Sequence, residues 1–265
     1  MVRPPFDCVW RRSDMSEGRR TYPNPPIREA ICAVNFEPCE NWDLRSPGEV
    51  YADLKGMYPG RPVQNVATQI ELMESHGGPP AIGVRPGEAV TQLQDATGTR
   101  LFTFGQASLA IRSLKPYEGW EAYRERIAAG IDAYTRHLTP GRLLRVGVRY
   151  INQIEFESAT VDLGQYFTKP PAVPDSLDLD MFTLAQSIES RSRADDVIII
   201  QKFQSSLSAS NTPTAILDID VVKEWNGGRA ANLKFLDEIE ALRTIERRVF
   251  EELITDEARR LFNGN

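Results

Sequence analysis

Residues that bind metal ions or form disulfides are scarce in this sequence. Its 265 residues include only two histidines, far apart, and three cysteines, Cys8, Cys32 and Cys39, none of which forms a C-x-x-C pair. A structural zinc site needs four such ligands at characteristic spacings, so we expect no metal and no other cofactor. A sparse, odd set of cysteines is typical of reduced thiols, and we therefore expect a cytoplasmic location.

Long apolar runs are also missing. No stretch approaches the roughly 20 apolar residues that a membrane-spanning helix needs, and the arginine-rich N-terminus lacks the apolar segment of a secretory signal. We therefore expect no membrane partner. Met15 begins Met-Ser-Glu-Gly just before the first structured segment, and we hypothesise that translation starts at Met15 in place of Met1.

Basic residues are not in excess, and catalytic signatures are lacking. The chain carries 31 Lys and Arg against 37 Asp and Glu, a net charge of −6, whereas binding to a nucleic-acid backbone depends on clustered positive charge. It has no G-x-x-x-x-G-K-[ST] loop, G-x-G-x-x-G, G-x-S-x-G or H-E-x-x-H. Nucleic acid is thus the least expected partner. We identify no catalytic residue, and whether the protein is an enzyme stays open.

The clearest pattern that is present covers residues 143–156, LLRVGVRYINQIEF. With the two-residue period of a strand, one face is apolar except at Asn152, and the other is mostly polar and carries Arg145 and Arg149. Such alternation is typical of an antiparallel sheet covered on one side only. The two arginines would lie on the uncovered face, roughly 13 Å apart at about 3.3 Å per residue.

The rest of the chain predicts two runs of elements in a similar order. Expected strands cover residues 27–36, 63–73, 81–84, 89–95, 100–112, 143–156, 179–191, 197–206 and 214–223; expected helices begin near residues 46, 117, 163 and 231, with a final turn after Thr255. Residues 83–87 are interpreted as a turn, and the glycines after Asn226 as the end of the last strand. Ser46 and Glu49 match a capping box, and the aromatic stripe of the 117–138 helix is interpreted as core.

The order of these elements predicts an α+β fold of two similar β-α-β(3-4)-α halves, as an internal duplication. Residues 1–24 would be a disordered extension, 25–140 the first half and 141–265 the second, either as two units or as one continuous domain. Each half would be a curved antiparallel sheet with its long helix packed on one face. The TATA-binding-protein-like arrangement has this order, an analogy of fold that carries no function.

Three segments resemble one family of proteins. GVRYINQI, residues 147–154, resembles the RYIN-type motif of a sporadically distributed, uncharacterised bacterial family of about this length. Residues 22–30, YPNPPIREA, are similar to its PP-I-x-E-A segment, and residues 116–120, PYEGW, are also similar. The family has no established activity, so the resemblance implies no catalytic residue or substrate. Its sporadic distribution suggests an accessory gene carried with mobile or defence systems.

The candidate binding residues gather on or beside the central strand. Arg145 and Arg149 could form a fork for a carboxylate or phosphate; the alternative is that they pair across the sheet with Asp218 and Asp220, which leave the apolar face of their own strand. The other candidates are Asn152 for a specific hydrogen bond, Gln153 on the polar face, Tyr150 as a core aromatic whose hydroxyl reaches the rim, and Glu29. We interpret Glu29 as a partner for an arginine across the two halves, with a general base as the alternative.

These features favour a binding or accessory protein. It would present an open sheet face, or a cleft between the halves, to a partner protein or a small ligand. The alternative is an enzyme or nucleotide-binding protein with a motif-free site between the halves, which requires a deep pocket with perturbed ionisable groups. Nucleic-acid binding is the third and least expected function.

Overall fold

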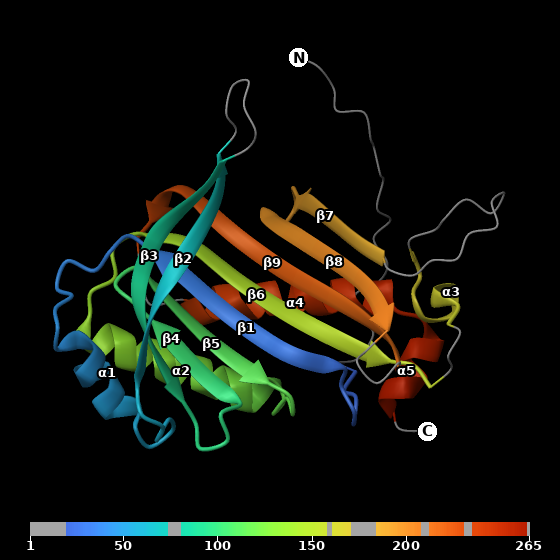
Figure 1. Cartoon of the computed structure of the whole chain (residues 1–265), viewed down its shortest axis with the longest axis horizontal. Coiled ribbons are helices and arrows are strands. Elements are labelled where there is room, and N and C mark those ends of the chain that lie inside the picture. The colour runs from blue at the N-terminus through green and yellow to red at the C-terminus, as the bar shows by residue number, and fades with distance from the viewer. Residues whose placement is uncertain are drawn as a thin grey trace, which may run out of the picture.

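Nine antiparallel strands form a single sheet, in the order β2-β3-β4-β5-β1-β6-β9-β8-β7 (Figure 1). The computed structural model describes residues 20–73, 81–157, 161–170, 184–207, 212–230 and 235–263, leaving aside the side chains of residues 67–73, 81–88, 206 and 207. The strands are β1 (Ile27–Phe36), β2 (Val63–Met73), β3 (Ala81–Gln94), β4 (Arg100–Phe104), β5 (Ser108–Leu114), β6 (Leu143–Glu155), β7 (Leu184–Ser192), β8 (Val197–Leu207) and β9 (Pro213–Arg229). The predicted α+β class and antiparallel sheet are confirmed.

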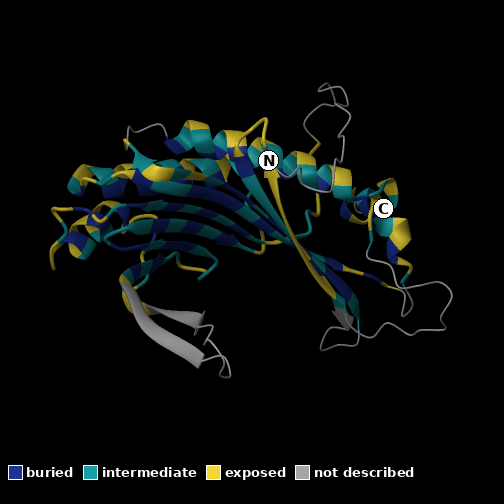
Figure 2. Cartoon of the chain, turned by 90° about the horizontal axis from the view of Figure 1, so that it is seen from above, coloured by how far each residue is buried: buried dark blue, intermediate teal, exposed yellow. Residues whose placement is uncertain are grey.

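Helices cover one face of this sheet. They are α1 (Ser46–Leu54), α2 (Trp120–His137), α3 (Leu163–Tyr166), α4 (Phe235–Leu253) and α5 (Asp256–Asn263). α4 contacts β6 and β9, α2 contacts β5, and α1 packs against α2. None of the helices in the described ranges lies on the opposite face of the central strands (Figure 2), so that face is open, as the alternation in residues 143–156 predicts. Among these helices, none has both the length and the apolar composition needed to cross a lipid bilayer.

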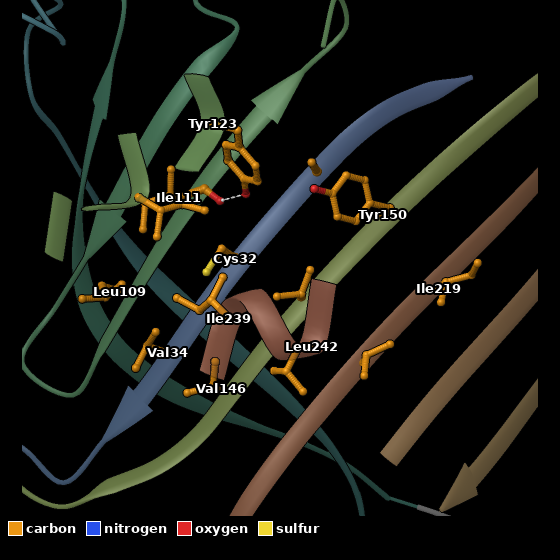
Figure 3. Close-up of a cluster of buried hydrophobic side chains, with 14 of the residues drawn as sticks. Cys32, Val34, Leu109, Ile111, Tyr123, Val146, Tyr150, Ile219, Ile239 and Leu242 are labelled. Atoms are coloured by element: carbon orange, nitrogen blue, oxygen red, sulfur yellow. Dashed lines mark hydrogen bonds between the residues drawn. The ribbon is translucent and has the colours of Figure 1, made fainter. Parts of the chain in front are cut away.

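The core lies between the central strands and the two long helices (Figure 3). β1 alternates along its length, with Ala30, Cys32 and Val34 fully buried against the helices. α2 contributes its predicted stripe, of which Tyr123 and Ile127 are fully buried and the Tyr123 hydroxyl donates to the Ile111 carbonyl oxygen at 2.7 Å. Burial of these apolar surfaces is the main stabilising contribution to the fold.

Several element boundaries differ from the prediction, and non-local pairing explains each. β3 is one continuous strand because its pairing with β2 runs through the expected turn at residues 83–87, with a register shift between Val66 and Thr68. Residues 100–112 form parts of two strands, because the chain turns back after Phe104 and the Gly105 N–H donates to the Ser108 carbonyl oxygen at 2.9 Å. β9 continues past Asn226 to Arg229, since Gly227 and Gly228, both at positive φ, absorb an irregularity opposite the start of β6.

The start of α1 also differs, because the expected capping box at Ser46 and Glu49 is wrong. Asp43 Oδ1 accepts from the Arg45 N–H at 2.8 Å and from the Ser46 N–H at 3.2 Å, whereas the Ser46 hydroxyl oxygen accepts from the Asp43 N–H at 2.9 Å. Arg45 holds the N-cap position without a side-chain cap, and the Gly48 and Glu49 N–H groups donate to its carbonyl oxygen at 2.9 and 3.0 Å.

Residues 20–24, the first that the structure describes, lie at the α4–α5 corner. Of the predicted N-terminal extension, the structure describes residues 20–24. The Tyr22 ring meets the Phe262 ring edge-on at 5.5 Å, its hydroxyl donates to Glu251 Oε1 at 2.8 Å, and the Asn24 N–H donates to the Phe262 carbonyl oxygen at 2.9 Å. Residues 20–24 are therefore held against the helices. The predictions for Cys8, Met15, residues 171–183 and residues 231–234 fall outside the described residues.

Candidate functional site

Arg149 is held on the open face by a bidentate ion pair. Its Nε donates to Asp218 Oδ1 at 2.7 Å and its Nη2 to Asp218 Oδ2 at 2.6 Å. In the β6–β9 register Arg149 lies directly opposite Asp220. Its side chain therefore reaches diagonally to Asp218, two residues away along β9. The pKa of the Arg149 guanidinium is raised, chiefly by this hydrogen-bonded pair. The predicted pairing across the sheet is confirmed for Arg149.

Arg145 is held more loosely. Its Nη2 lies 3.4 Å from Asp220 Oδ2 and its Nε lies 3.7 Å from Glu224 Oε1, whereas charge-assisted hydrogen bonds are usually about 2.7–2.9 Å long. The guanidinium folds back over Gly147, such that a β-carbon at residue 147 would lie 3.3 Å from Arg145 Nη1. Two neighbouring arginines on one strand therefore differ, one fixed by a carboxylate and one available to a better acceptor.

A small hollow opens beside Arg145 on the open face. It has a volume of about 180 Å³ and is lined by Ile31, Ala33, Arg145, Gly147, Arg149 and Asp220. Gly147 and Ala33 lie directly opposite each other across the β6–β1 pair, so neither residue contributes a large side chain of its own, and the Arg145 guanidinium covers part of the space above Gly147. Burial raises the pKa of the Asp220 carboxyl, and Arg145 and Arg149 only partly offset this effect. This hollow, bordered by a buried carboxyl and a loosely held arginine, is the candidate site on the open face.

Glu29 also lies on the open face, but its partner is not the expected one. Glu29 Oε1 accepts from Arg112 Nε at 2.6 Å. Arg112 belongs to β5, the neighbour of β1 on the side away from β6, so the expected pair across the two halves is wrong. Glu29 nevertheless contributes to the raised pKa of Arg149 on β6.

The candidate residues of the RYIN motif divide between the two faces. Tyr150 and Asn152 lie on the helix-covered face, 1% and 2% exposed. Asn152 Nδ2 donates to the Leu217 carbonyl oxygen at 3.2 Å, and the Tyr150 hydroxyl oxygen lies 3.1 Å from that of the half-buried Tyr117. Tyr150 is therefore the core aromatic that the sequence predicts. Gln153 lies on the open face, where its Nε2 donates to Glu155 Oε1 at 2.8 Å, so it shares the face of Arg145 and Arg149, but of these three residues only the two arginines line the hollow.

A buried ion pair contacts the Tyr150 ring on the helix-covered face, where the sequence predicts only apolar core. Arg243 Nη1 donates to Glu246 Oε2 at 2.7 Å, and the Arg243 guanidinium lies 4.5 Å from the centroid of the Tyr150 ring. Glu246 is 3% exposed, and burial raises its pKa to about 7 although Arg243 acts in the opposite direction. The sequence could have revealed this buried carboxylate, because Glu246 falls on the buried stripe of α4 between Leu242 and Phe250.

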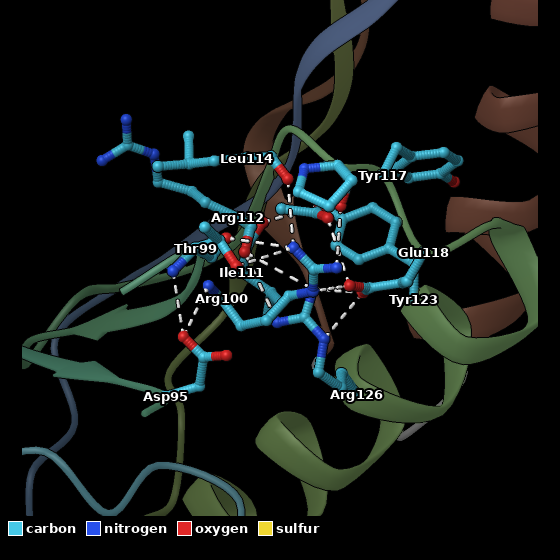
Figure 4. Close-up of polar contacts among 12 residues, drawn as sticks. Asp95, Thr99, Arg100, Ile111, Arg112, Leu114, Tyr117, Glu118, Tyr123 and Arg126 are labelled. Atoms are coloured by element: carbon cyan, nitrogen blue, oxygen red, sulfur yellow. Dashed lines mark hydrogen bonds and ion pairs between the residues drawn. The ribbon is translucent and has the colours of Figure 1, made fainter. Parts of the chain in front are cut away.

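A second buried charge cluster joins β4 to the start of α2 (Figure 4). Glu118 Oε1 accepts from Arg126 Nε at 2.8 Å, and Glu118 Oε2 forms an ion pair with Arg100. The Arg100 guanidinium also donates to the Leu114 carbonyl oxygen at 3.0 Å. These side chains are 10–17% exposed. Because every contact named connects elements of the fold, we assign the cluster a structural role.

Comparison with known proteins adds no assignment to these sites. No protein-family model matches the chain, and no curated protein matches it. Within the described residues, no group of three or more His, Cys, Asp or Glu side chains is placed to hold a metal ion.

Proposed function

We propose that this is a binding protein, an accessory factor that holds a partner protein or a small ligand on the open face of its sheet. The observation that carries the proposal is the loosely held Arg145 beside the hollow above Gly147. A guanidinium presents several N–H donors in a planar fork, which matches a carboxylate or a phosphate. The ligand group that binds Arg145 is therefore anionic.

The neighbouring residues give this site its shape. Arg149 keeps its bidentate bond to Asp218 and forms a fixed wall. Arg145 exchanges its contacts of 3.4 and 3.7 Å with Asp220 and Glu224 for shorter bonds to the ligand. Ile31 and Ala33 add an apolar border. Asp220, once separated from Arg145, accepts a hydrogen bond from a donor on the same ligand.

We also infer that the chain arose by duplication and that the site lies at the junction of its halves. In support, strands β5, β4 and β3 follow β1 outward in the sheet as β9, β8 and β7 follow β6. A long helix, α2 or α4, follows the last strand of each half. This order supports our proposed analogy with a TATA-binding-protein-like saddle. The hollow draws its lining from β1, β6 and β9, and so from both halves.

Two alternative functions receive less support. A pocket that encloses a whole substrate or nucleotide usually measures about 300–1,000 Å³, whereas the hollow at Gly147 measures about 180 Å³ and would take only the anionic group of a ligand that lies on the open face. A nucleic-acid interface needs uncompensated positive charge. On the open face Arg112, Arg145 and Arg149 each have a carboxylate partner. We place the protein in the cytoplasm, in keeping with the burial of Cys32 and Cys39.

Native mass spectrometry of protein purified gently from the organism that encodes it tests the proposal. We expect the wild-type chain to carry an added mass, either a small molecule or a protein. The Arg145→Gln variant should lose it, because the amide cannot replace a charged planar fork. The Arg136→Gln variant is the matched control, since the Arg136 side chain is exposed on α2 and lies outside the hollow. Wild-type protein without added mass, or equal retention by Arg145→Gln, would contradict the proposal.

A further inference from the structure

β7 is an exposed strand at the edge of the sheet. Residues 185–191 are all exposed, although a strand normally buries one of its faces. In the part of the chain that the structure describes, β7 pairs with β8 alone and forms the last strand of the sheet (Figure 1). Its outer N–H and C=O groups are therefore an open template for a further strand.

This edge lacks most of the features that usually block pairing. Proteins protect edge strands with prolines, lysines, bulges or very short strands. β7 has nine residues, contains no proline or lysine, and keeps an uninterrupted register with β8 from Leu184 to Ser192. A partner strand can therefore pair along the full length of β7.

An exposed isoleucine lies at the centre of the edge. Ile188 is 45% exposed and borders a second hollow, on the helix side of β7 and β8, together with Phe203 and Leu217. Exposure of an apolar side chain beside an apolar hollow gives a driving force for association, because a partner removes that surface from water.

We propose that β7 pairs antiparallel with β7 of a second copy of this chain, about a two-fold axis at Ile188. In this register all nine residues pair and the two Ile188 side chains meet. Ser187 then faces Glu189 of the second copy, and Ala185 faces Arg191, so no two like charges are directly opposite. A two-fold interface requires such a self-complementary strand, and the pairing continues the antiparallel pattern of the sheet.

A disulfide placed at the axis tests this register. In a Cys8→Ser background the remaining cysteines, Cys32 and Cys39, are fully buried. An Ile188→Cys substitution brings two thiols directly opposite each other, at a Cα separation of about 4.5–5.5 Å that a disulfide accepts. The matched control is Ser192→Cys, because the two copies of residue 192 lie about 26 Å apart at about 3.3 Å per residue.

Under mild oxidation we expect Ile188→Cys to form a covalent dimer on a non-reducing gel and Ser192→Cys to remain a monomer. Analytical ultracentrifugation gives the second readout: the wild-type chain should sediment as a dimer and the Ile188→Lys variant as a folded monomer, since Ile188 is already half-exposed. Cross-linking of both cysteine variants to the same extent would overturn the proposed register and interface. A monomeric wild type together with no Ile188→Cys dimer would overturn the proposal altogether.

Discussion

Arg149 of β6 and Asp218 of β9 form a two-point ion pair across the open face, 69 residues apart in the chain. The Asp218 side chain is only 10% exposed, whereas that of Arg149 is 34% exposed. The pair therefore connects two central strands where solvent is partly excluded. A charge-assisted hydrogen bond contributes more to stability there than on a fully exposed surface.

Substitution at this pair should lower stability. Asp218→Asn and Arg149→Gln are each expected to reduce the free energy of unfolding by about 1–2 kcal/mol. The double variant should lose less than the sum of the two, because both substitutions break the same interaction. Urea unfolding of the wild type, the two single variants and the double variant measures the interaction energy between the two residues. Fully additive losses would show that this interaction contributes no stability.

Removal of Glu118 should be more costly, because it leaves two guanidinium groups without their carboxylate. For Glu118→Ala we expect a loss of about 3 kcal/mol in the free energy of unfolding, as seen when one partner of a buried ion pair is removed. The control is Glu125→Ala on the exposed side of α2, with an expected change within about 0.5 kcal/mol. Similar losses in the two variants, measured by thermal or urea unfolding, would argue against the structural role of the cluster.

The raised pKa of Glu246 predicts a dependence of stability on pH. The carboxyl has a pKa of about 7 in the folded chain, against an ordinary value of 4.5. Between these values the folded state keeps a proton that the unfolded state has lost, so the contribution of Glu246 to stability falls as pH rises from about 4.5 to 7. Above that range both states are ionised and this contribution is constant.

The Glu246→Gln variant isolates this effect, since glutamine has similar size and cannot ionise. We expect the wild type to lose stability relative to the variant between pH 5 and pH 8, as measured by urea unfolding at both values. A constant difference between the two proteins across this range would mean that Glu246 is already ionised at pH 5 in the folded chain.

Asn152 and Gln153 are adjacent in β6 but lie on opposite faces of the sheet, so their substitution should affect stability differently. Asn152 is 2% exposed and its amide donates to a buried carbonyl oxygen, so Asn152→Ala should reduce the free energy of unfolding by about 1–2 kcal/mol. Gln153→Ala, on the open face, should change it by no more than about 0.5 kcal/mol. Thermal unfolding distinguishes the two, and equal effects would contradict the assignment of Asn152 to the interior.

The sequence predicts the elements whose pattern is local and repeated. β6 and α2 follow from periods of two and of 3.6 residues, which can be counted along the chain without knowing the fold. The hairpin between β4 and β5 is missed because the alternation of β4 resumes in β5 after a short turn at Gly105. β3 is predicted as two strands because it contains Pro86, and proline usually ends a strand. In the structure the pairing with β2 continues through Pro86, so the strand is continuous.

The candidate site illustrates the same limit. The amino-acid sequence by itself determined that Arg145 and Arg149 share the polar face of one strand and that Tyr150 and Asn152 share the other, because side chains alternate strictly along an extended backbone. Only the tertiary structure decided that Arg149 is bound to Asp218 by two short hydrogen bonds while Arg145, beside a hollow, has only longer contacts to Asp220 and Glu224. That difference depends on the register of β9 against β6 and on the small residue that β1 places opposite Gly147. Both relationships join residues far apart in the chain, and a local pattern carries no information about them.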